Sequence, residues 1–393
     1  MIKKDGIISM KIFEPLQIKN KTIPNRLLAQ AMEGNDCENA GQPSQRTINR
    51  YEKLAEGKWG TVFIEAVSVT ESSIARINGM IINKKNLDSI KRLIDAFKNR
   101  SKESIILMQL THSGKYSGVF SEKVSLTLQD KNGARYISCD EIAQIRDQFI
   151  NAGQLGEQAG ADGIDIKMCH GYFGCEMLRP SNTREDKWGT SFENRTRFLR
   201  EVTQGIKSSV NSNFIIGSRL SLFEGIKGGC GTAGPEEIVE DFYEMFDVIR
   251  LMNTLDMDYV NVSAGIPAVT GTITRPVEPS KYLALHHLRY AKTVKDLVKN
   301  ENLKLKVIGS AYSTYKDEAI NVANDMLCRD YVDLCGFGRQ TFADPLTPKK
   351  LKNAEEICWC VLCSGCTKLM LNQINDGCIV YDDYYKQLNR NLK

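Results

Sequence analysis

The chain has 393 residues, 42% of them hydrophobic and 25% charged, which is typical of a globular protein with a large core. Its 52 Lys and Arg and 48 Asp and Glu leave a net charge of +4, so no basic face for nucleic acid is indicated. No apolar run has transmembrane length, and the polar start MIKKDGIISMKIFEPL is not typical of a signal peptide. Since twelve cysteines are scattered through such a chain, we expect free thiols and a cytoplasmic protein.

Short apolar segments of strand length, rich in Ile, Val or Leu, recur along the chain and predict strands buried on both faces. They are Leu27–Met32, Thr61–Val67, Ile105–Leu110, Gly163–Met168, Ile215–Leu220, Tyr259–Ala264, Val307–Ala311 and Leu334–Gly338. Amphipathic stretches between them predict helices at Thr47–Ala55, Leu87–Lys98, Glu141–Ala159, Ser191–Ser209, Glu236–Thr254, His287–Asn300 and Tyr315–Met326. This alternation predicts a (β/α)8 TIM barrel. A doubly wound sheet is less favoured because no G-x-G-x-x-G turn follows the first strand.

Two prolines, Pro345 and Pro348, predict where the barrel ends. We therefore expect a barrel over residues 10–350 and a short Cys-rich C-terminal tail over residues 351–393. The connections after Leu110, Leu220 and Ala264 are long, as expected for loops that build a catalytic face. Within the first of them, residues 117–137 are expected to form a small hairpin over that face.

The segment from Asp162 to Phe198 holds the densest group of chemically reactive side chains. In its strand, Asp165 and Lys167 share one face, while the apolar residues point to the other. Cys169, His170 and Tyr172 follow directly. Polar side chains at the carboxyl end of a parallel strand predict an active site, and the alternative is an exposed strand end that leads into a charged loop.

Four fragments occur in order along the chain: IFEPLQIKNKTIPNRL, QLTHSGKYS, HGYFGCEML with SFENRTRF, and DLCGFGRQTFADP. Together they resemble the Old Yellow Enzyme family of FMN-dependent ene-reductases, also called NADH:flavin oxidoreductases and including proteins like 2,4-dienoyl-CoA reductase. The resemblance covers about Ile12 to Cys378. It implies a TIM barrel that binds FMN noncovalently at the carboxyl ends of its strands and takes electrons from NADH or NADPH.

The resemblance also implies which side chains hold FMN. Gln109 would meet the pyrimidine edge of the flavin, since an amide both donates and accepts hydrogen bonds. Arg219 would stabilise the anionic reduced flavin, and its alternative is a salt bridge inside the barrel mouth. The backbone near Met32 is a weaker candidate, because Ala31 stands where many relatives have proline. The expected phosphate site, which could instead be plain turns, comprises Gly309, Ser310, Gly338 and Arg339.

In the family, a His-x-x-His or His-x-x-Asn pair polarises the substrate carbonyl, flavin N5 delivers hydride to the β-carbon, and a tyrosine protonates the α-carbon. The matching positions here are Lys167, His170 and Tyr172, so the first position departs from the pattern. An ammonium would stabilise a developing enolate or bind a substrate carboxylate. Lys167 could instead pair with Asp165 or the flavin, and His170 could be a structural histidine.

Five of the twelve cysteines lie between Cys358 and Cys378, and four of them form the pattern C-x2-C-x2-C-x11-C. These four are Cys360, Cys363, Cys366 and Cys378. Such spacing suits one metal centre. Long members of the family carry a [4Fe–4S] cluster with similar spacing, which relays electrons to a further flavin domain. A structural zinc site and unligated thiols are the alternatives.

The first hypothesis is therefore an FMN-dependent oxidoreductase that reduces an activated C=C bond in an enone, an enoate or an enoyl thioester. The second is a flavin dehydrogenase that oxidises an amine. The third is a flavin and iron–sulfur protein that transfers electrons or senses redox state. The expected partners are a small unsaturated carbonyl or carboxylate substrate and a redox protein, with a homo-oligomer left open and neither nucleic acid nor membrane expected.

Overall fold

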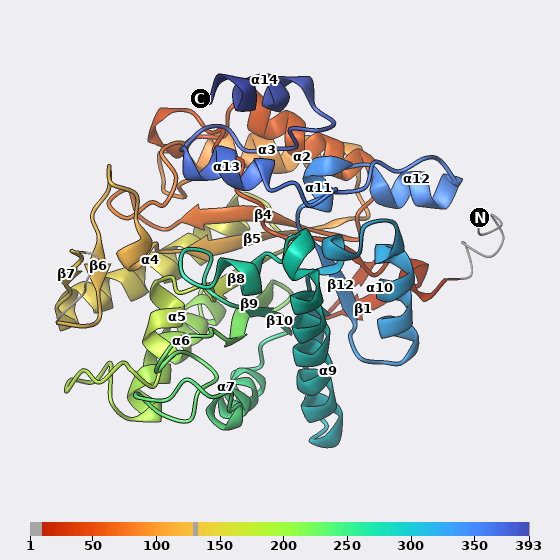
Figure 1. Ribbon diagram of the computed structural model, residues 1–393. Helices are drawn as coiled ribbons and strands as arrows, with labels where there is room; N and C mark the ends of the chain where they lie inside the picture. The colour runs from red at the N-terminus through yellow and green to blue at the C-terminus, as the bar shows by residue number, and fades with distance from the viewer. Residues whose placement is uncertain (1–9, 129–132, 393) are drawn as a thin grey trace.

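The computed structural model describes residues 10–128 and 133–392, and its centre is a closed barrel of eight parallel strands (Figure 1). The strands are β3 (Leu27–Ala29), β4 (Thr61–Ser68), β5 (Ile105–Thr111), β8 (Gly163–Met168), β9 (Ile215–Phe223), β10 (Tyr259–Ala264), β11 (Lys306–Gly309) and β12 (Leu334–Phe337). Each pairs with the next, and β12 closes the barrel by pairing with β3 through Cys335 and Leu27. The predicted (β/α)8 barrel is confirmed, with each strand lying on one of the predicted apolar segments.

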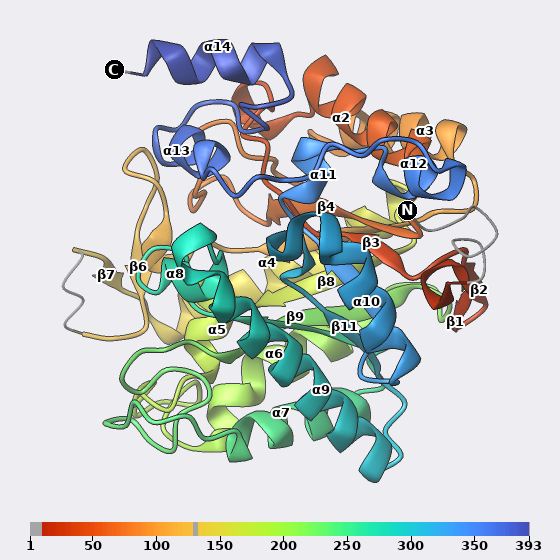
Figure 2. The ribbon, with the colours of Figure 1, turned by 45° about the vertical axis from the view of Figure 1, so that its right-hand side comes forward.

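Helices surround the barrel and cover the outer faces of the strands (Figures 1 and 2). They are α2 (Gln45–Glu56), α3 (Leu87–Arg100), α4 (Cys139–Gln158), α6 (Phe192–Lys207), α7 (Tyr243–Thr254), α9 (Ala284–Asn300) and α10 (Ala319–Cys328). Shorter helices are α5 (Phe173–Leu178), α8 (Gly271–Thr274) and α11 (Gln340–Ala343), and the 3-10 turns are η1 (Lys11–Phe13), η2 (Asn39–Gly41), η3 (Gly114–Tyr116), η4 (Glu278–Leu283) and η5 (Tyr312–Glu318). No helix in the described ranges is long and apolar enough to cross a membrane.

Two helices begin later than the sequence predicts. Helix α7 starts at Tyr243, not at residue 236, with Phe242 as its N-cap, and the Asp241 carboxylate just before it accepts the Tyr243 amide at 2.8 Å. An isolated bridge between Thr232 and Glu240 closes a loop of turns and bends over the preceding residues. The other helix is interrupted at Lys316, whose φ of 53° is left-handed, so η5 precedes α10.

The predicted hairpin over residues 117–137 is wrong. The two short strands in this segment, β6 (Val124–Ser125) and β7 (Arg135–Tyr136), run parallel, with Val124 opposite Arg135. A hairpin requires antiparallel strands. Part of the predicted hairpin, residues 129–132, lies outside the described residues.

A true hairpin closes the amino end of the barrel. Strands β1 (Leu16–Ile18) and β2 (Lys21–Ile23) pair antiparallel, with Leu16 opposite Ile23. Their buried side chains join an apolar cluster with Leu28, Ile105 and other residues inside the barrel. Burial of this apolar surface seals one end of the barrel, so its polar interior lies toward the carboxyl end.

The C-terminal segment lies over the carboxyl end of the barrel, beside α2 and α3 (Figures 1 and 2). Its helices there are α13 (Gly365–Leu371) and α14 (Asp383–Asn391), whereas α12 (Thr347–Asn353), which precedes them, is bonded through the Lys349 amide to the Gly57 carbonyl near the amino end of β4. The Asp376 amide donates to the carbonyl of Gly34 at 2.7 Å. Asn35 Nδ2 donates to the Ile374 carbonyl at 3.2 Å, and Asn375 Nδ2 donates to the Asn35 carbonyl at 2.6 Å, between the same two segments. These bonds join the end of the chain to the loop after the first barrel strand.

Candidate active site and cysteine cavity

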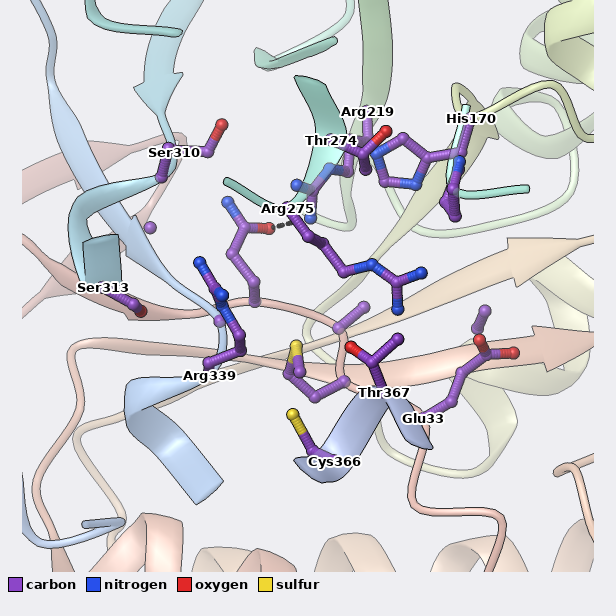
Figure 3. Close-up of a pocket in the computed structure, with 18 of the residues that line it drawn as sticks. Glu33, His170, Arg219, Thr274, Arg275, Ser310, Ser313, Arg339, Cys366 and Thr367 are labelled. Carbon is purple, nitrogen blue, oxygen red and sulfur yellow. Dashed lines mark hydrogen bonds between the residues drawn. The ribbon is translucent and has the colours of Figure 1, made fainter. Parts of the chain in front are cut away.

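A cavity opens at the carboxyl end of the barrel, enclosed by strand ends, by the connection after β10 and by the C-terminal segment (Figure 3). It encloses about 1070 Å³, including the part open to solvent. Ten of the residues expected from the sequence line it: Met32, Gln109, Lys167, His170, Tyr172, Arg219, Ser310, Gly338, Arg339 and Cys366.

A network of polar side chains crosses the barrel below this cavity. Arg219 donates from Nη1 to Gln30 Oε1 at 2.7 Å, and Gln30 and Asn261 exchange hydrogen bonds of 3.0 and 2.9 Å. Gln30 follows directly after β3, and Asn261 is the register partner of Arg219. The side chains of Gln30 and Asn261 were not expected at this site from the sequence. Both are polar residues inside predicted apolar segments, and that interruption is the pattern that could have pointed to them.

Arg219 keeps one donor unused. Its Nη2 lies 3.3 Å from Ser263 Oγ, but its buried Nε has no hydrogen-bond partner. Burial lowers the pKa of this guanidinium, and no carboxylate among the described residues forms an ion pair with it. The alternative of a salt bridge in the barrel mouth is therefore not realised. An unsatisfied buried donor on a charged group is costly, which fits a group that binds a ligand.

Gln109 lines the cavity, but it also has a protein partner. Its Nε2 donates to Asp165 Oδ2 at 2.7 Å, and Tyr259 donates to the other oxygen of Asp165 at 3.1 Å. Burial raises the pKa of Asp165 to about 7. Lys167 does not pair with this carboxylate in the described residues.

The residues expected to bind phosphate come together in part. Ser310, Gly338 and Arg339 line the cavity, together with Ser313 and Thr314, whereas Gly309 does not. A Cβ on Gly309 would lie 2.6 Å from Tyr312 Oη, so this glycine permits packing. Arg339 donates to the Pro276 carbonyl at 2.7 Å and lies 3.3 Å from Thr314 Oγ1, which holds its guanidinium at the cavity wall.

His170 and Tyr172 follow β8 on a sharp turn. His170 has a φ of 65° and Gly171 a φ of 74°, two consecutive left-handed residues. The His170 amide donates to Ser221 Oγ at 2.9 Å, and its Nε2 lies 2.8 Å from Ser263 Oγ. Burial, with the charges of Arg219 and Lys167, lowers the pKa of His170 well below its ordinary value, so the ring is neutral near pH 7. Figure 3 shows the ring pointing into the cavity toward Arg219.

Lys167 is buried, with 4% of its surface exposed, and its ammonium contacts an aromatic ring. Its Nζ lies 3.7 Å from the centroid of Tyr172, a cation–π contact. Tyr172 is the N-cap residue of α5. The structure thus brings the three expected catalytic residues to one side of the cavity.

Three charged side chains at this end were not expected from the sequence. Arg76, from the connection after β4, forms an ion pair with Glu33 at 3.1 Å, and Arg275 comes from the connection after β10. The long loop after Ala264 was expected to reach the catalytic face, but its irregular backbone does not reveal which side chain turns inward.

The four tail cysteines surround a second, smaller cavity of about 340 Å³. Burial raises the pKa of the Cys360 and Cys378 thiols, and that of Cys366 to about 12. No three of the four offer sulfur atoms within 4.8 Å of one another; among the described residues only two other groups are that compact. Four thiolates bound to one zinc ion at 2.3 Å would lie about 3.8 Å apart. The sulfur atoms of these cysteines are thus not drawn together as closely as the ligands of one zinc ion.

The two cavities share part of their lining. Arg339 and Cys366 border both the large cavity and the cysteine cavity. Figure 3 shows the two side chains at the same side of the large cavity, below Ser313. Cys358 borders neither cavity in the described structure, as expected from its place outside the cysteine pattern.

A parallel barrel with four arginines and a neutral histidine in a carboxyl-end cavity has the features of an enzyme that binds a phosphorylated cofactor. A family model matches residues 11–356, and the chain belongs to the NADH:flavin oxidoreductase / NADH oxidase family. It is an NAD(P)H-dependent flavin oxidoreductase of the Old Yellow Enzyme type. Family membership supports FMN as its flavin and NAD(P)H as its reductant.

Several relatives are similar over most of this chain. An NADPH dehydrogenase from Clostridium acetobutylicum is 30% identical over 88% of this chain and 96% of its own length. The N,N-dimethylglycine/sarcosine dehydrogenase of Chromohalobacter salexigens is 26% identical over 94% of this chain and 52% of its own. The structure of 2-naphthoyl-CoA reductase, at 22% identity, superposes with a TM-score of 0.81 over 96% of this chain and 58% of that one. The chain thus spans about half the length of two of these relatives.

Proposed function

We propose that this protein reduces an activated C=C bond in an unsaturated carbonyl or carboxylate compound, with FMN as cofactor and NADH or NADPH as electron donor. The observation that carries the proposal is the convergence of neutral His170, the Lys167 ammonium and Tyr172 at one side of the cavity. Hydrogen-bond donors and a proton donor on one side suit a reaction in which negative charge develops on a substrate oxygen.

The residues present fit FMN. The unused Nε of Arg219 is a donor for the flavin ring, and Arg339 with the Ser313 and Thr314 hydroxyls provides donors for a phosphate. Gly338 leaves room beside them, because a Cβ there would lie 3.1 Å from Met32 Sδ. When bound, FMN supplies the hydride for the β-carbon of the substrate.

The protein's own groups then perform the remaining steps. Lys167 and His170 hold the substrate oxygen and stabilise the negative charge that develops on it. Tyr172 donates its phenolic proton to the α-carbon. The ammonium of Lys167, 3.7 Å from the ring centroid, stabilises the phenolate that remains until solvent returns a proton.

The charges in the cavity disfavour the alternative of amine oxidation. Lys167, Arg76 and Arg275 line the reacting end, and the carboxylate of Glu33 is already paired with Arg76. An ammonium substrate would enter against this excess of positive charge. Amine oxidation is the second candidate function, because one relative is named N,N-dimethylglycine/sarcosine dehydrogenase.

We further propose that the four tail cysteines bind a [4Fe–4S] cluster, with zinc as the alternative. The wide spacing of their sulfurs around a hollow supports the cluster. Arg339 borders that hollow and would offset part of the negative charge of four thiolates. Cys366 extends to the large cavity, so a redox partner protein could exchange electrons with the flavin site along this route.

The test separates the two half-reactions of the FMN-loaded protein. Under anaerobic conditions the flavin is first reduced with NADPH or NADH, then mixed with 2-cyclohexenone, cinnamaldehyde or cinnamate. Return of the oxidised flavin spectrum with formation of the saturated product supports C=C reduction. Bleaching of the oxidised flavin by dimethylglycine or dimethylamine, with no response to any of the unsaturated compounds, would establish the amine reaction instead.

A further inference from the structure

The segment between the last two cysteines of the pattern lies across the mouth of the large cavity, and we call residues 367–377 the strap. Three of its side chains, Thr367, Met370 and Asp376, line the cavity. Figure 3 shows Thr367 on the same side of the cavity as Glu33. The hairpin of β1 and β2 seals the opposite end of the barrel. We therefore expect ligands to enter and leave at the end that the strap covers.

Hydrogen bonds fasten the strap to two loops of the barrel. Three of them join it to Gly34 and Asn35 in the loop after β3. Two more join it to the connection after β4, where Gln373 Oε1 accepts the Ile77 amide at 3.0 Å and Gln373 Nε2 donates to the Ala75 carbonyl at 3.2 Å. These bonds involve four consecutive residues of the strap, 373–376, which form its anchored part.

The same two loops supply part of the cavity wall. Glu33 comes from the loop after β3 and Arg76 from the connection after β4, and their side chains form an ion pair at 3.1 Å. A movement of the strap would therefore change the cavity in two ways. It would withdraw the side chains of the strap itself, and it would release the loops that hold this ion pair.

The two ends of the strap meet at the cysteine cavity. Cys366 directly precedes the strap and Cys378 directly follows it, and both border that cavity. The flanking residues are packed so closely that a Cβ on Gly365 would clash with the side chain of Ile379, so glycine permits this approach. A metal centre bound to both cysteines would join two ends that already lie side by side.

The backbone beside the third cysteine is in an unfavourable conformation. Leu362 and Ser364, on either side of Cys363, each have a φ of 60°, in the left-handed region. Residues other than glycine adopt this region at a cost in free energy. Bonds from the cysteines to a metal centre would offset that cost, because metal binding stabilises the fold of its ligand loops. Without the metal, the loop gains by relaxing.

We propose that the metal centre at the four cysteines fastens the strap as a lid over the cavity. With the metal bound, the strap is closed into a loop and retains FMN and substrate. Without the metal, its cysteine end opens and ligands exchange faster, because closing a loop removes open conformations. The inference rests on the proposed flavin function and metal site. It requires no electron transfer through the metal, so an iron–sulfur cluster and a zinc ion would both fill this role.

Hydrogen exchange on the full-length, FMN-loaded protein tests the lid. Metal-loaded protein is compared with protein stripped by a chelator and with Cys363→Ser. Cys363 lies outside the strap, so an effect on the strap in this variant passes through the metal, and Cys358→Ser is the matched control. We expect peptides over residues 367–377 to exchange about tenfold faster or more after metal loss. Peptides over β8 should exchange at an unchanged rate.

Variants of the anchors test the strap without touching a cysteine. Gln373→Ala and Asn375→Ala remove bonds to the barrel loops. Asn372→Ala is the control, because its side chain donates to the Lys368 carbonyl within α13. The two anchor variants should keep their metal and release FMN about tenfold faster, as should stripped wild-type protein, which decides the matter if a variant does not fold. Release is followed by the recovery of flavin fluorescence.

The outcomes separate this inference from those on which it rests. A metal-loaded protein whose strap exchanges no faster after stripping would overturn the lid and keep the metal site. Faster exchange of the strap with an unchanged rate of FMN release would show that the strap does not retain ligands. Protein purified without oxygen that contains no metal would refute the metal site and the lid together. Failure to bind FMN would refute the proposed function itself.

Discussion

The ammonium nitrogen of Lys167 lies 3.7 Å from the centroid of the Tyr172 ring. Lys167 is the second-last residue of β8, and Tyr172, five residues later, is the N-cap of α5. The turn through His170 and Gly171 brings the two side chains together. Both groups belong to the proposed reaction, one as the cation beside the substrate oxygen and the other as the proton donor. Because they are in contact, the positive charge of Lys167 stabilises negative charge on Tyr172 when the phenol gives up its proton.

Replacing Tyr172 by Phe keeps the ring under the ammonium but removes the acidic proton. We expect the rate of flavin reoxidation by substrate to fall by about 10²–10³-fold, as is typical for loss of a general acid. Reduction of the flavin by NADPH should be nearly unchanged, which stopped-flow absorbance can measure separately. An equal fall in both half-reactions would mean that Tyr172 shapes the site without donating the proton.

Arg339→Gln tests the proposed phosphate site. Its guanidinium is held by the Pro276 carbonyl and lies beside Thr314. Loss of a charged hydrogen bond should weaken FMN binding by about 10–100-fold. Riboflavin, which lacks the phosphate, is the matched ligand and should bind both proteins equally, as followed by quenching of flavin fluorescence. A similar loss for the two flavins would place the phosphate elsewhere.

The cysteine cavity predicts iron in protein purified without oxygen. Cys363→Ser should abolish the iron content and the broad absorption that overlaps the flavin bands, because Cys363 borders the cavity. The matched control is Cys358→Ser, since Cys358 contacts Gln340 through its backbone carbonyl and does not border the cavity. Elemental analysis that finds zinc and no iron in the wild-type protein would replace the cluster by a structural metal site.

Asp165 predicts a pH dependence of stability. Burial raises its pKa from 3.8 to about 7, so between these two values the folded protein holds a proton that the unfolded chain has lost. This contribution to the free energy of unfolding is present below pH 3.8 and is lost as the pH rises through 7. Its size is on the order of a few kcal/mol, at about 1.4 kcal/mol for each unit of pKa.

Asp165→Asn imitates the protonated carboxyl and should therefore remove this part of the slope. Urea denaturation of the two proteins at pH 5, 6 and 7.5 measures it, with the exposed Asp317→Asn as a control that keeps the wild-type slope. Parallel profiles for wild type and Asp165→Asn would show that the carboxyl is already ionised in the folded protein at pH 5.

The barrel is predictable from the sequence because its strands are buried on both faces. Residues such as Val62, Ile64 and Leu107 are buried. Because neither face of these strands meets solvent, each strand appears in the sequence as a short apolar run. The positions of Lys167, His170 and Tyr172 follow in the same way, because they stand at the end of one such run. Helix starts are less predictable, as α7 shows, because the hydrogen bonds at a helix start depend on local geometry.

The other residues of the cavity could not be predicted from local sequence patterns. Gln30 and Asn261 are 231 residues apart and meet only because the barrel closes. Arg275 belongs to an irregular connection, and the direction of its side chain depends on the C-terminal segment with Met370. Gly309 was expected in the phosphate site because glycine is common there, but Tyr312 packs against it. Contacts between distant segments decide each of these outcomes.

The hydrogen bond from the Asp376 amide to the Gly34 carbonyl links residues that are synthesised far apart in time. A chain that emerges from the ribosome in order completes β12 before Thr367, Met370 and Asp376 can cover the cavity. The hairpin of β1 and β2 has by then sealed the other end, so the carboxyl end is the entrance open to a cofactor. Synthesis order thus places the residues that cover the cavity after the barrel strands that form its floor.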